Sequence, residues 1–396
     1  MNSPILYNTE KAFTLKSNSE LFQTKLMYRI MNYTWLTKLL TKLVNFSLKI
    51  GLPIKPLIKK TVFKQFCGGE TINESKIVII KLYGINVKSI LDYSVEGAST
   101  DENFTNTLNE TLKIIQTAHN NPSIPYTCIK LTGFVDTKLL EKVSSNQELS
   151  AIEQQEWLNL KNRLSTLFDA AQKYNVPVFI DAEESWIQPA IDKLAEEFMV
   201  NYNRNNHVVL TTLQMYRNDR LPYLKKLIKF ARFHQIKLGI KLVRGAYLEK
   251  ENERAKKLNY PSPINSTKAI TDSEFDSAVK LCLDNIDIIM LCAGTHNEIS
   301  TLLLLDEMKK RNLPNNHPNI FFSQLYGMSD NITMNLGAHE YNVTKYVPYG
   351  PVESVIPYLI RRAQENSGIA GQMSRELKMI LHEQTRRNQL KLSGNA

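Results

Sequence analysis

Two adjacent arginines, Arg361 and Arg362, lie in the segment YLIRRAQEN and form the clearest candidate anion site in the sequence. Neighbouring side chains on a helix point about 100° apart, so both can contact one anion only if it lies between them. This fork suits a carboxylate. The alternative is that Arg361 pairs with Glu365 one turn later while Arg362 is only solvated.

Further polar side chains lie within or directly after short apolar runs. Lys130 lies in TCIKL, Lys241 in GIKLV, and Asp181 and Glu183 follow VFI. A lysine in such a run must reach solvent or an acidic partner, and we expect Asp181 to pair with Lys130. The other polar strand ends are Asp92, Glu96, Gln214, Arg244, Thr295, His296, Asn297, Gln324 and Tyr346. Any one of them could be a structural group, but together they predict one opening that binds an anionic, heteroatom-rich ligand.

The elements that would position these residues are eight predicted strands separated by amphipathic helical stretches. Strands alternating with helices over roughly 280 residues are typical of a closed (β/α)8 barrel, with an open sheet as the alternative. In such barrels the reactive residues project from the carboxyl ends of the strands. The predicted strands are SILDY, TCIKL, VFIDA, VVLTTLQ, GIKLV, IDIIML, NIFFSQ and TKYV.

Three regions divide the chain. Residues 1–85 predict an N-terminal helical arm, with helices in LFQTKLMYRIMNY and WLTKLLTKLVNFSLKI, and residues 86–370 predict the α/β barrel. Residues 371–396 predict a C-terminal helix and a polar tail.

Composition and missing motifs exclude several classes of protein. The cysteines are far apart without a CxxC pair, so neither a disulfide framework nor a metal site is predicted, and Cys128 and Cys292 are expected in the core. His296 has no second ligand at metal spacing. The sequence contains no GxGxxG after a strand, no GxxxxGK[ST] loop and no HExxH, so a Rossmann cofactor and a P-loop nucleotide are disfavoured. The opening residues lack a secretory or transit pattern, which predicts the cytoplasm.

Five separated motifs resemble the proline dehydrogenase family in the family's order. They are FIDAEESWIQPAID, GIKLVRGAYLEKENERA, GTHN, FSQLYGMSDNIT and YVPYGPVESVIPYLIRRAQEN, within a likeness that spans about Ser89 to Asn366. The resemblance implies a distorted (β/α)8 barrel that holds FAD noncovalently. It also implies oxidation of L-proline to 1-pyrroline-5-carboxylate, with electrons passed to a membrane quinone.

The resemblance also implies roles for individual residues. Arg361, Arg362 and Lys130 would bind the proline carboxylate, Tyr346 would pack against the ring, and Asp181 and Lys241 would be the catalytic residues. Many bacterial members have Arg where this chain has Lys241 and Lys where it has Arg244. The implied flavin contacts are Gln214, Lys241, Val243, Arg244, Gly245, Ala246, Tyr247, Thr295, His296, Asn297 and Leu325, with Glu365 near the site.

Two rival functions remain. A hydroxyproline dehydrogenase of the same fold is disfavoured because the bulk of Tyr346 should crowd a ring hydroxyl, and a basic nonenzymatic binding protein would carry no flavin. The net charge of +10 then predicts peripheral contact with the anionic membrane that holds the quinone, rather than binding to nucleic acid. The predicted location is a bacterial cytoplasm with peripheral contact at the inner face of the membrane, and the alternative is the mitochondrial matrix.

Overall fold

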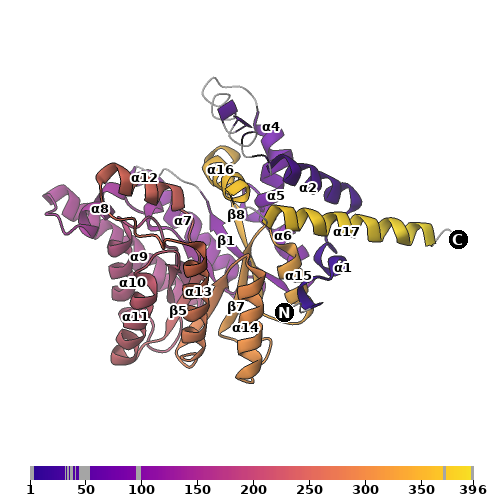
Figure 1. The fold of residues 1–396 in the computed structure, drawn as a ribbon. Coiled ribbons are helices and arrows are strands. Elements are labelled where there is room, and N and C mark those ends of the chain that lie inside the picture. The colour runs from indigo at the N-terminus through magenta and orange to yellow at the C-terminus, as the bar shows by residue number, and fades with distance from the viewer. Residues whose placement is uncertain are drawn as a thin grey trace.

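The fold is an eight-stranded parallel sheet curled into a barrel, with helices outside it (Figure 1). The computed structural model describes residues 4–31, 33, 35, 39–40, 42–43, 54–94, 100–368 and 372–393, except for the side chains of residues 4, 363–368 and 372–374. The strand order is β1-β8-β7-β6-β5-β4-β3-β2. The strands are β1 Val87–Tyr93, β2 Thr127–Ile129, β3 Val178–Ile180, β4 Val209–Gln214, β5 Leu238–Val243, β6 Ile289–Gly294, β7 Ile320–Leu325 and β8 Val343–Tyr349.

All eight strands predicted from the sequence are confirmed, although the sixth is displaced. The apolar run IDIIML covers residues 286–291, whereas β6 starts at Ile289 and continues to Gly294. A turn follows the preceding helix, in which the backbone N–H groups of Ile288 and Ile289 donate to the carbonyl of Asn285. Ile286 and Ile288 pack against the core from this turn, so their apolar character reflects burial rather than strand pairing.

The barrel is joined by backbone ladders everywhere except between β1 and β2, which are the two ends of the sheet. These two strands still lie side by side. The Thr127 hydroxyl donates to the Leu91 carbonyl at 3.0 Å, and the Ser89 N–H donates to the Ser123 carbonyl at 2.8 Å. The barrel is therefore closed at this seam by isolated hydrogen bonds instead of a ladder.

Alternation along the strands separates an inner from an outer apolar layer. At the centre of the inner layer, the Tyr126 ring meets the rings of Phe179 and Phe321 edge-on, with centroids 5.1 and 5.2 Å apart. Gly239 faces the same layer, where a Cβ atom would lie 2.0 Å from the Leu210 side chain, so only glycine fits. The inner layer consists of Ile90, Tyr126, Cys128, Phe179, Leu210, Met290, Cys292 and Phe321, with Tyr346 against it.

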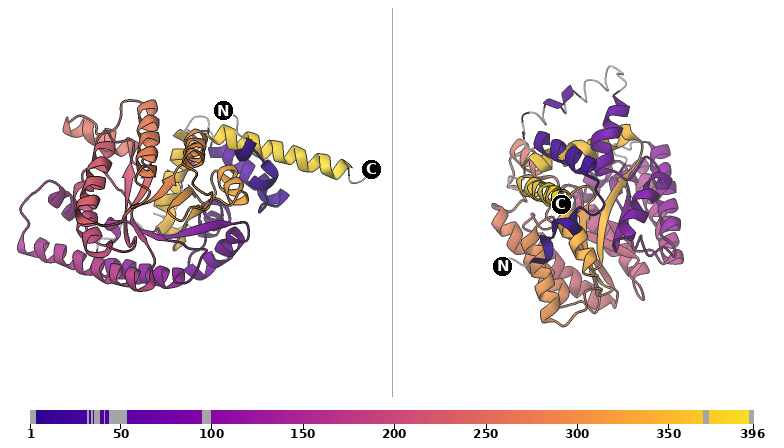
Figure 2. Two further views of the ribbon diagram at one scale, coloured as in Figure 1. Left: turned by 90° about the horizontal axis from the view of Figure 1, so that it is seen from below. Right: turned by 90° about the vertical axis from the view of Figure 1, so that its right-hand side faces the viewer.

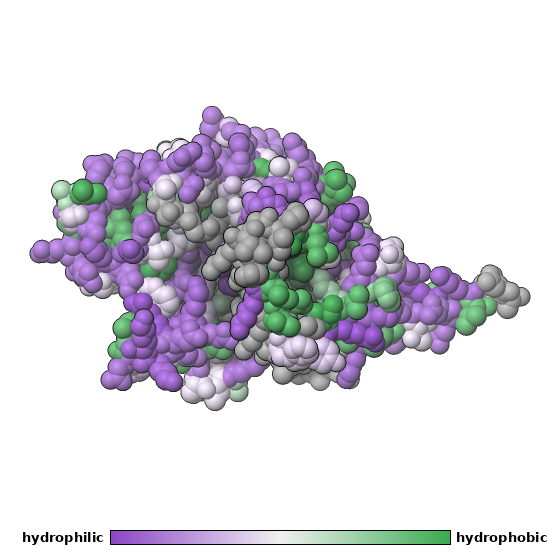
Figure 3. Space-filling model, turned by 90° about the horizontal axis from the view of Figure 1, so that it is seen from above, coloured by the Kyte–Doolittle hydropathy of each residue, from purple (hydrophilic) through white to green (hydrophobic). Residues whose placement is uncertain are grey.

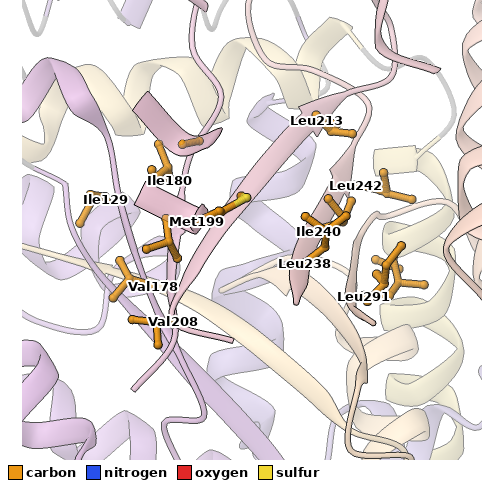
Figure 4. Close-up of a cluster of buried hydrophobic side chains, with 14 of the residues drawn as sticks. Ile129, Val178, Ile180, Met199, Val208, Leu213, Leu238, Ile240, Leu242 and Leu291 are labelled. Carbon is orange, nitrogen blue, oxygen red and sulfur yellow. The ribbon is translucent and has the colours of Figure 1, made fainter. Parts of the chain in front are cut away.

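The outer layer binds the strands to the surrounding helices. Figure 4 shows part of it, including Ile240 and Leu242 of β5 and Met199 of a flanking helix. The longest of these helices starts with a capping box in which Ser150 and Glu153 satisfy each other's backbone N–H groups. The elements are α7 Asp101–Ala118, η3 Leu131–Gly133, α8 Thr137–Ser144, α9 Ala151–Tyr174, α10 Gln188–Tyr202, α11 Arg220–His234, α12 Leu248–Leu258, α13 Lys268–Leu283, α14 Glu298–Lys310, α15 Asp330–Ala338 and α16 Val352–Gly368.

Helices from both ends of the chain pack together beside the barrel (Figure 2). The Tyr28 hydroxyl of α2 lies 2.9 Å from a carboxylate oxygen of Glu376 in α17, which joins the two ends directly. The predicted helix around LFQTKLMYRIMNY is confirmed, whereas most of WLTKLLTKLVNFSLKI lies outside the described residues. These elements are η1 Pro4–Leu6, α1 Thr9–Ala12, α2 Asn18–Met31, α4 Lys55–Ile58, the π-helical turn η2 Lys59–Phe63, α5 Lys64–Phe66, α6 Ile72–Tyr83 and α17 Gln372–Ser393.

Two further findings concern the described part of the chain. The cysteines are all reduced and buried, which confirms the expectation for Cys128 and Cys292. Within the described ranges, no helix has both the length and the apolar character to cross a bilayer.

Candidate active site

A chain of charged and hydroxyl groups crosses the carboxyl-end mouth of the barrel. The Lys130 ammonium donates to Asp92 at 3.3 Å and to the Tyr346 hydroxyl at 3.4 Å. Tyr346 donates in turn to Asp181 at 3.3 Å, and Asp181 forms a buried ion pair with Lys241. Each residue belongs to a different strand or follows its end, so the barrel brings together five groups from distant parts of the sequence.

The ion pairs among these five groups differ from the sequence prediction. Lys130 was expected to pair with Asp181, but its acidic partner is Asp92 and the cation beside Asp181 is Lys241. The reason is the strand alternation: Lys241 lies between outward-facing Ile240 and Leu242, so its side chain enters the barrel and reaches Asp181. Burial lowers the pKa of the Lys241 ammonium, but the charge of Asp181 and its hydrogen bond, together with the nearby Cys128 and Cys292, outweigh this effect and the net pKa is raised. Lys241 is thus a fixed cation inside the barrel.

A pocket of about 180 Å³ lies next to this row of hydrogen-bonded groups. Lys130, Glu183, Tyr247 and Arg361 are among the residues that line it, so the barrel brings two predicted substrate-binding cations to one small cavity. Cys128 and Ile129 at the end of β2 also line it. With Lys130, Lys250 and Arg361 among its lining residues beside the apolar Ile129, the pocket suits a small molecule that carries a carboxylate.

Glu183 is the unusual acid in this pocket. Its carboxylate accepts hydrogen bonds from the Thr132 N–H at 3.1 Å and from the Thr132 hydroxyl. Burial nevertheless raises the pKa of Glu183 to about 7, because the bonds from Thr132 and the charge of Lys130 offset only part of the lost hydration. The carboxyl group therefore titrates near neutral pH.

The two adjacent arginines have different surroundings. Arg361 lines the small pocket, whereas the buried Arg362 guanidinium lies over the ring of Tyr358, 5.2 Å from its centroid. The alternative in which Arg362 is only solvated is wrong, because the residue is buried and only 8% of its surface is exposed. A joint grip of both arginines on one carboxylate stays a prediction.

His296 lies on the side of the mouth near Arg362. Its Nδ1 is 2.9 Å from the Ser329 hydroxyl oxygen, and the Ser329 N–H donates to Glu376 of α17 at 2.9 Å. Burial lowers the pKa of His296 to about 3, and the nearby cations Lys345, Arg362 and Arg244 add to this effect. The imidazole is therefore neutral and is held through Ser329 by the C-terminal helix.

The predicted flavin contacts gather at the ends of β4 to β7. The Gln214 amide donates to the Glu183 carbonyl at 2.7 Å and accepts from the Ala246 N–H at 3.1 Å, which fixes the loop after β5. Arg244 donates to Asp272 at 2.6 Å, to the Thr295 hydroxyl at 2.6 Å and to the Ser300 hydroxyl at 2.9 Å.

The remaining predicted contacts surround this network. Asn297 caps α14 by accepting from the Ile299 and Ser300 N–H groups, and Leu325 packs beside the terminal helices. Val243 ends β5, and Tyr247 lines the small pocket. The side chain of Glu365 lies outside the described residues.

The chemistry of this side fits an anionic cofactor with many heteroatoms. Gly245 has φ +140°, and a Cβ atom there would lie 2.4 Å from the Tyr216 ring, so the chain leaves bare backbone at the mouth. The neighbouring strand ends carry the Arg244 cation, the neutral His296 ring and the amides of Gln214 and Asn297. These groups are suited to a diphosphate and a polar heterocycle.

Two acidic residues without a predicted role are prominent in the structure. Asp92 and Glu183 were recognised only as polar strand ends, yet Asp92 pairs with Lys130 and Glu183 lines the pocket. The spacing of Asp181 and Glu183 was the available signal, because residues i and i+2 after a strand can both face the mouth.

Comparisons with known proteins identify the family. The model of the family described as proline dehydrogenase matches residues 77–375. The mitochondrial proline dehydrogenase 1 of Dictyostelium discoideum is 32% identical over 431 residues, covering 98% of this chain and 75% of that protein. The hydroxyproline dehydrogenase of Xenopus laevis is 27% identical over 412 residues, covering 95% of this chain and 88% of that protein.

A solved structure supports the fold. Proline utilization A from Bdellovibrio bacteriovorus superimposes with a TM-score of 0.71 at 21% identity, covering 79% of this chain. The chain spans 34% of that larger protein. On the family match and the barrel that carries it, the chain belongs to the proline dehydrogenase family and is an oxidoreductase of (β/α)8 fold.

Proposed function

We propose that this chain oxidises L-proline to 1-pyrroline-5-carboxylate with FAD as its cofactor and a membrane quinone as electron acceptor. The observation that carries the proposal is the small pocket lined by Lys130 and Arg361 beside the buried Asp181–Lys241 pair. The pocket offers cations for a carboxylate, and the pair lies next to it at the centre of the mouth.

The substrate would be held by its carboxylate. Lys130 and Arg361 would contact the carboxylate, Arg362 would complete the grip, and the Tyr346 ring would pack against the pyrrolidine. The hydroxyl of Tyr346 is 3.4 Å from Lys130 and 3.3 Å from Asp181, so the ring has one preferred orientation. Holding a substrate in a single pose lowers the entropic part of the barrier.

The proline amine must be neutral to react. We propose no dedicated general base, because an amine that loses its proton to water on binding is sufficient.

The cofactor would lie along the ends of β4 to β7. Gln214, Lys241, Val243, Arg244, Gly245, Ala246, Tyr247, Thr295, His296, Asn297 and Leu325 would hold it, with Glu365 nearby. When bound, the flavin supplies the acceptor for the hydride that leaves the carbon next to the ring nitrogen. Asp181 would act by fixing Lys241, whose cation lies in the barrel centre.

The membrane and the cell compartment belong to the same proposal. A quinone acceptor requires peripheral contact with a bilayer, and the net charge of +10 favours an anionic one. The D. discoideum relative is named mitochondrial, which favours the matrix over a bacterial cytoplasm with peripheral membrane contact.

The test is anaerobic titration of the purified protein with L-proline while its visible spectrum is recorded. Bleaching of an oxidised flavin band at about 450 nm is expected. A colourless protein that FAD does not reconstitute would refute the assignment.

A second candidate function is oxidation of hydroxyproline, which the X. laevis relative favours. Tyr346 opposes it, because its ring should crowd a ring hydroxyl on the substrate. The same titration with hydroxyproline decides, since faster bleaching by hydroxyproline than by proline would reverse the preference.

A further inference from the structure

The loop between β7 and α15 is fixed by side chains from both ends of the chain. The Gly327 carbonyl accepts from the Tyr28 hydroxyl at 2.7 Å and from the Gln65 amide at 2.8 Å. The Ser329 N–H donates to Glu376 of α17 at 2.9 Å. This loop belongs to the motif FSQLYGMSDNIT, and the proposed function leaves its GMSD segment without a role.

A buried cation holds the rest of the loop. The Lys345 ammonium is fully buried, donates to the Met328 carbonyl and forms an ion pair with Asp330 at 3.0 Å. The Lys16 ammonium of the N-terminal region lies 3.5 Å from the same carboxylate. Because burying charged groups costs hydration energy, we infer that this cluster fixes the loop in one geometry rather than simply adding stability.

Ser329 has an unusual backbone conformation, and its hydroxyl does not cap the helix that it precedes. The residue lies in the left-handed region with a φ of +51°, which serine rarely adopts. It is the N-cap of α15, a position at which a serine oxygen usually accepts from the first turn of the helix. Ser329 makes no such side-chain cap bond, and its hydroxyl oxygen lies 2.9 Å from Nδ1 of His296 instead. The hydroxyl is therefore directed to the imidazole at the barrel mouth.

The distances around this hydroxyl indicate which nitrogen of His296 carries the ring proton. The imidazole is neutral, so one of its nitrogens donates a hydrogen bond and the other accepts one. The Ser329 hydroxyl oxygen lies 2.9 Å from Nδ1 but 3.5 Å from the Glu376 carboxyl oxygen, so Nδ1 is the nearer acceptor for the hydroxyl proton. With Nδ1 as an acceptor, the ring carries its own proton on Nε2.

Glu376 lies at the barrel end of α17, in the second turn of the helix. The far end of the helix projects from the molecule and is mostly hydrophilic (Figure 3). One carboxyl oxygen of Glu376 accepts from the Ser329 N–H, and the other accepts from the Tyr28 hydroxyl at 2.9 Å. The carboxyl group therefore ties α2 and α17 to the residue that contacts His296.

We propose that Glu376 is a positioning residue for the flavin side of the site: it holds Ser329 so that the Ser329 hydroxyl donates to Nδ1 of His296 and the ring keeps its proton on Nε2. The Nε2–H group is then available to donate to an acceptor atom of the cofactor. The inference rests on the proposed function for that acceptor, whereas the hydrogen-bond network consists of residues of this chain.

The test is ¹⁵N NMR of the full chain labelled at its histidines, with and without FAD, because the shifts of the ring nitrogens distinguish the two tautomers. The His296→Gln variant identifies the signal of His296. We expect the wild type to carry the proton on Nε2. Ser329→Ala, which removes only the hydroxyl, and Glu376→Ala should each populate the Nδ1–H form. Glu376→Gln keeps an oxygen that accepts from the Ser329 N–H and should restore the wild-type tautomer.

A double-mutant cycle on FAD affinity tests the consequence for the cofactor. The dissociation constant of FAD, measured by flavin fluorescence, should rise about threefold to tenfold in Glu376→Ala. The same substitution should add little in the His296→Ala background, because a positioning residue acts only through the group that it positions. Additive losses would show a separate structural role and would overturn the proposal.

Glu383 provides a matched control on the same helix. Its buried carboxylate binds Arg386 at 2.8 Å and Arg387 at 2.7 Å, about two turns beyond Glu376. Glu383→Gln should loosen the packing of α17 while the tautomer of His296 and the affinity for FAD stay as in the wild type. This control separates the specific contact of Glu376 from a general loss of helix packing.

Three NMR outcomes would overturn the proposal: a wild-type proton on Nδ1, an unchanged tautomer in Ser329→Ala or Glu376→Ala, or an equal change in Glu383→Gln. If Glu376→Ala does not fold, Tyr28→Phe removes the partner of the other Glu376 oxygen and should give a smaller shift in the same direction, and an unchanged signal would again refute the role of Glu376. A chain that binds no FAD would remove the proposed function, while the tautomer of the cofactor-free chain would still decide the role of Glu376.

Discussion

Replacing Glu183 by Gln should remove a pH-dependent destabilisation of the folded state. Glu183 is 3% exposed, and burial raises its pKa from 4.5 to about 7. Because the folded protein holds this proton more tightly than the unfolded chain, the group stabilises the fold only at low pH. That contribution begins to fall above the unfolded pKa and is lost as pH rises through 7.

The magnitude follows from the pKa difference. One unit of pKa is worth about 1.4 kcal/mol, so a change from 4.5 to about 7 corresponds to about 3 kcal/mol. Between pH 5 and pH 8 the wild type should lose about 2 to 3 kcal/mol relative to Glu183→Gln. The amide keeps the shape of the carboxyl group and can still accept from the Thr132 N–H, so packing is unchanged.

The assay is urea unfolding of both proteins at pH 5 and pH 8 with saturating FAD. Other titrating groups are common to both proteins and cancel in the difference. Exposed Glu249→Gln serves as the control, for which the difference from wild type should be the same at both pH values. If wild type and Glu183→Gln also differ by a constant amount, the reasoning about the burial of Glu183 is refuted.

Three further predictions concern the site and the barrel. Lys241→Met and Asp181→Asn should each lower the free energy of unfolding by about 3 to 5 kcal/mol, and the double variant by less than the sum; additive losses in a double-mutant cycle would contradict the pairing. Arg361→Lys should raise the KM for proline about tenfold to hundredfold with a smaller change in kcat, because Lys lacks the guanidinium fork; unchanged steady-state kinetics would remove Arg361 from the substrate site. Asn203→Ala should lower the free energy of unfolding by about 2 to 4 kcal/mol, measured with denaturant. The buried amide of Asn203 accepts hydrogen bonds from two backbone N–H groups and donates to two carbonyls around β4 and β5. A change below about 1 kcal/mol would show that water replaces the side chain.

The barrel was predictable because each strand leaves a local signal. Apolar runs such as VFI and GIKLV are short, β-branched and separated by helical periodicity, and these properties depend only on nearby residues. The displaced start of β6 shows the limit: Ile286 and Ile288 are half-buried in a turn, and an apolar run alone does not distinguish such a turn from a strand.

The partners at the mouth were not predictable in the same way. Lys130, Asp181 and Lys241 all belong to predicted strand ends, but which of them meet depends on barrel closure, strand tilt and side-chain direction. The direction of the Lys241 side chain could have been inferred from its position between the apolar Ile240 and Leu242. The pairing of Lys130 with Asp92 depends instead on how β1 and β2 meet at the seam. The division at residues 85 and 370 stays a prediction, because helices from both ends pack against each other.

Lys130 has a structural role at the seam between β1 and β2 and a proposed role in substrate binding. Asp92 ends one side of the seam and Lys130 follows the other, so their ion pair acts as a clasp where the backbone ladder is missing. Lys130 is also the cation proposed to hold the substrate carboxylate. Barrel closure and the proposed substrate binding would therefore compete for one ammonium group. Tighter binding of a substrate by Lys130 would weaken its ion pair with Asp92. A stabilising substitution elsewhere along the seam would compensate for that loss.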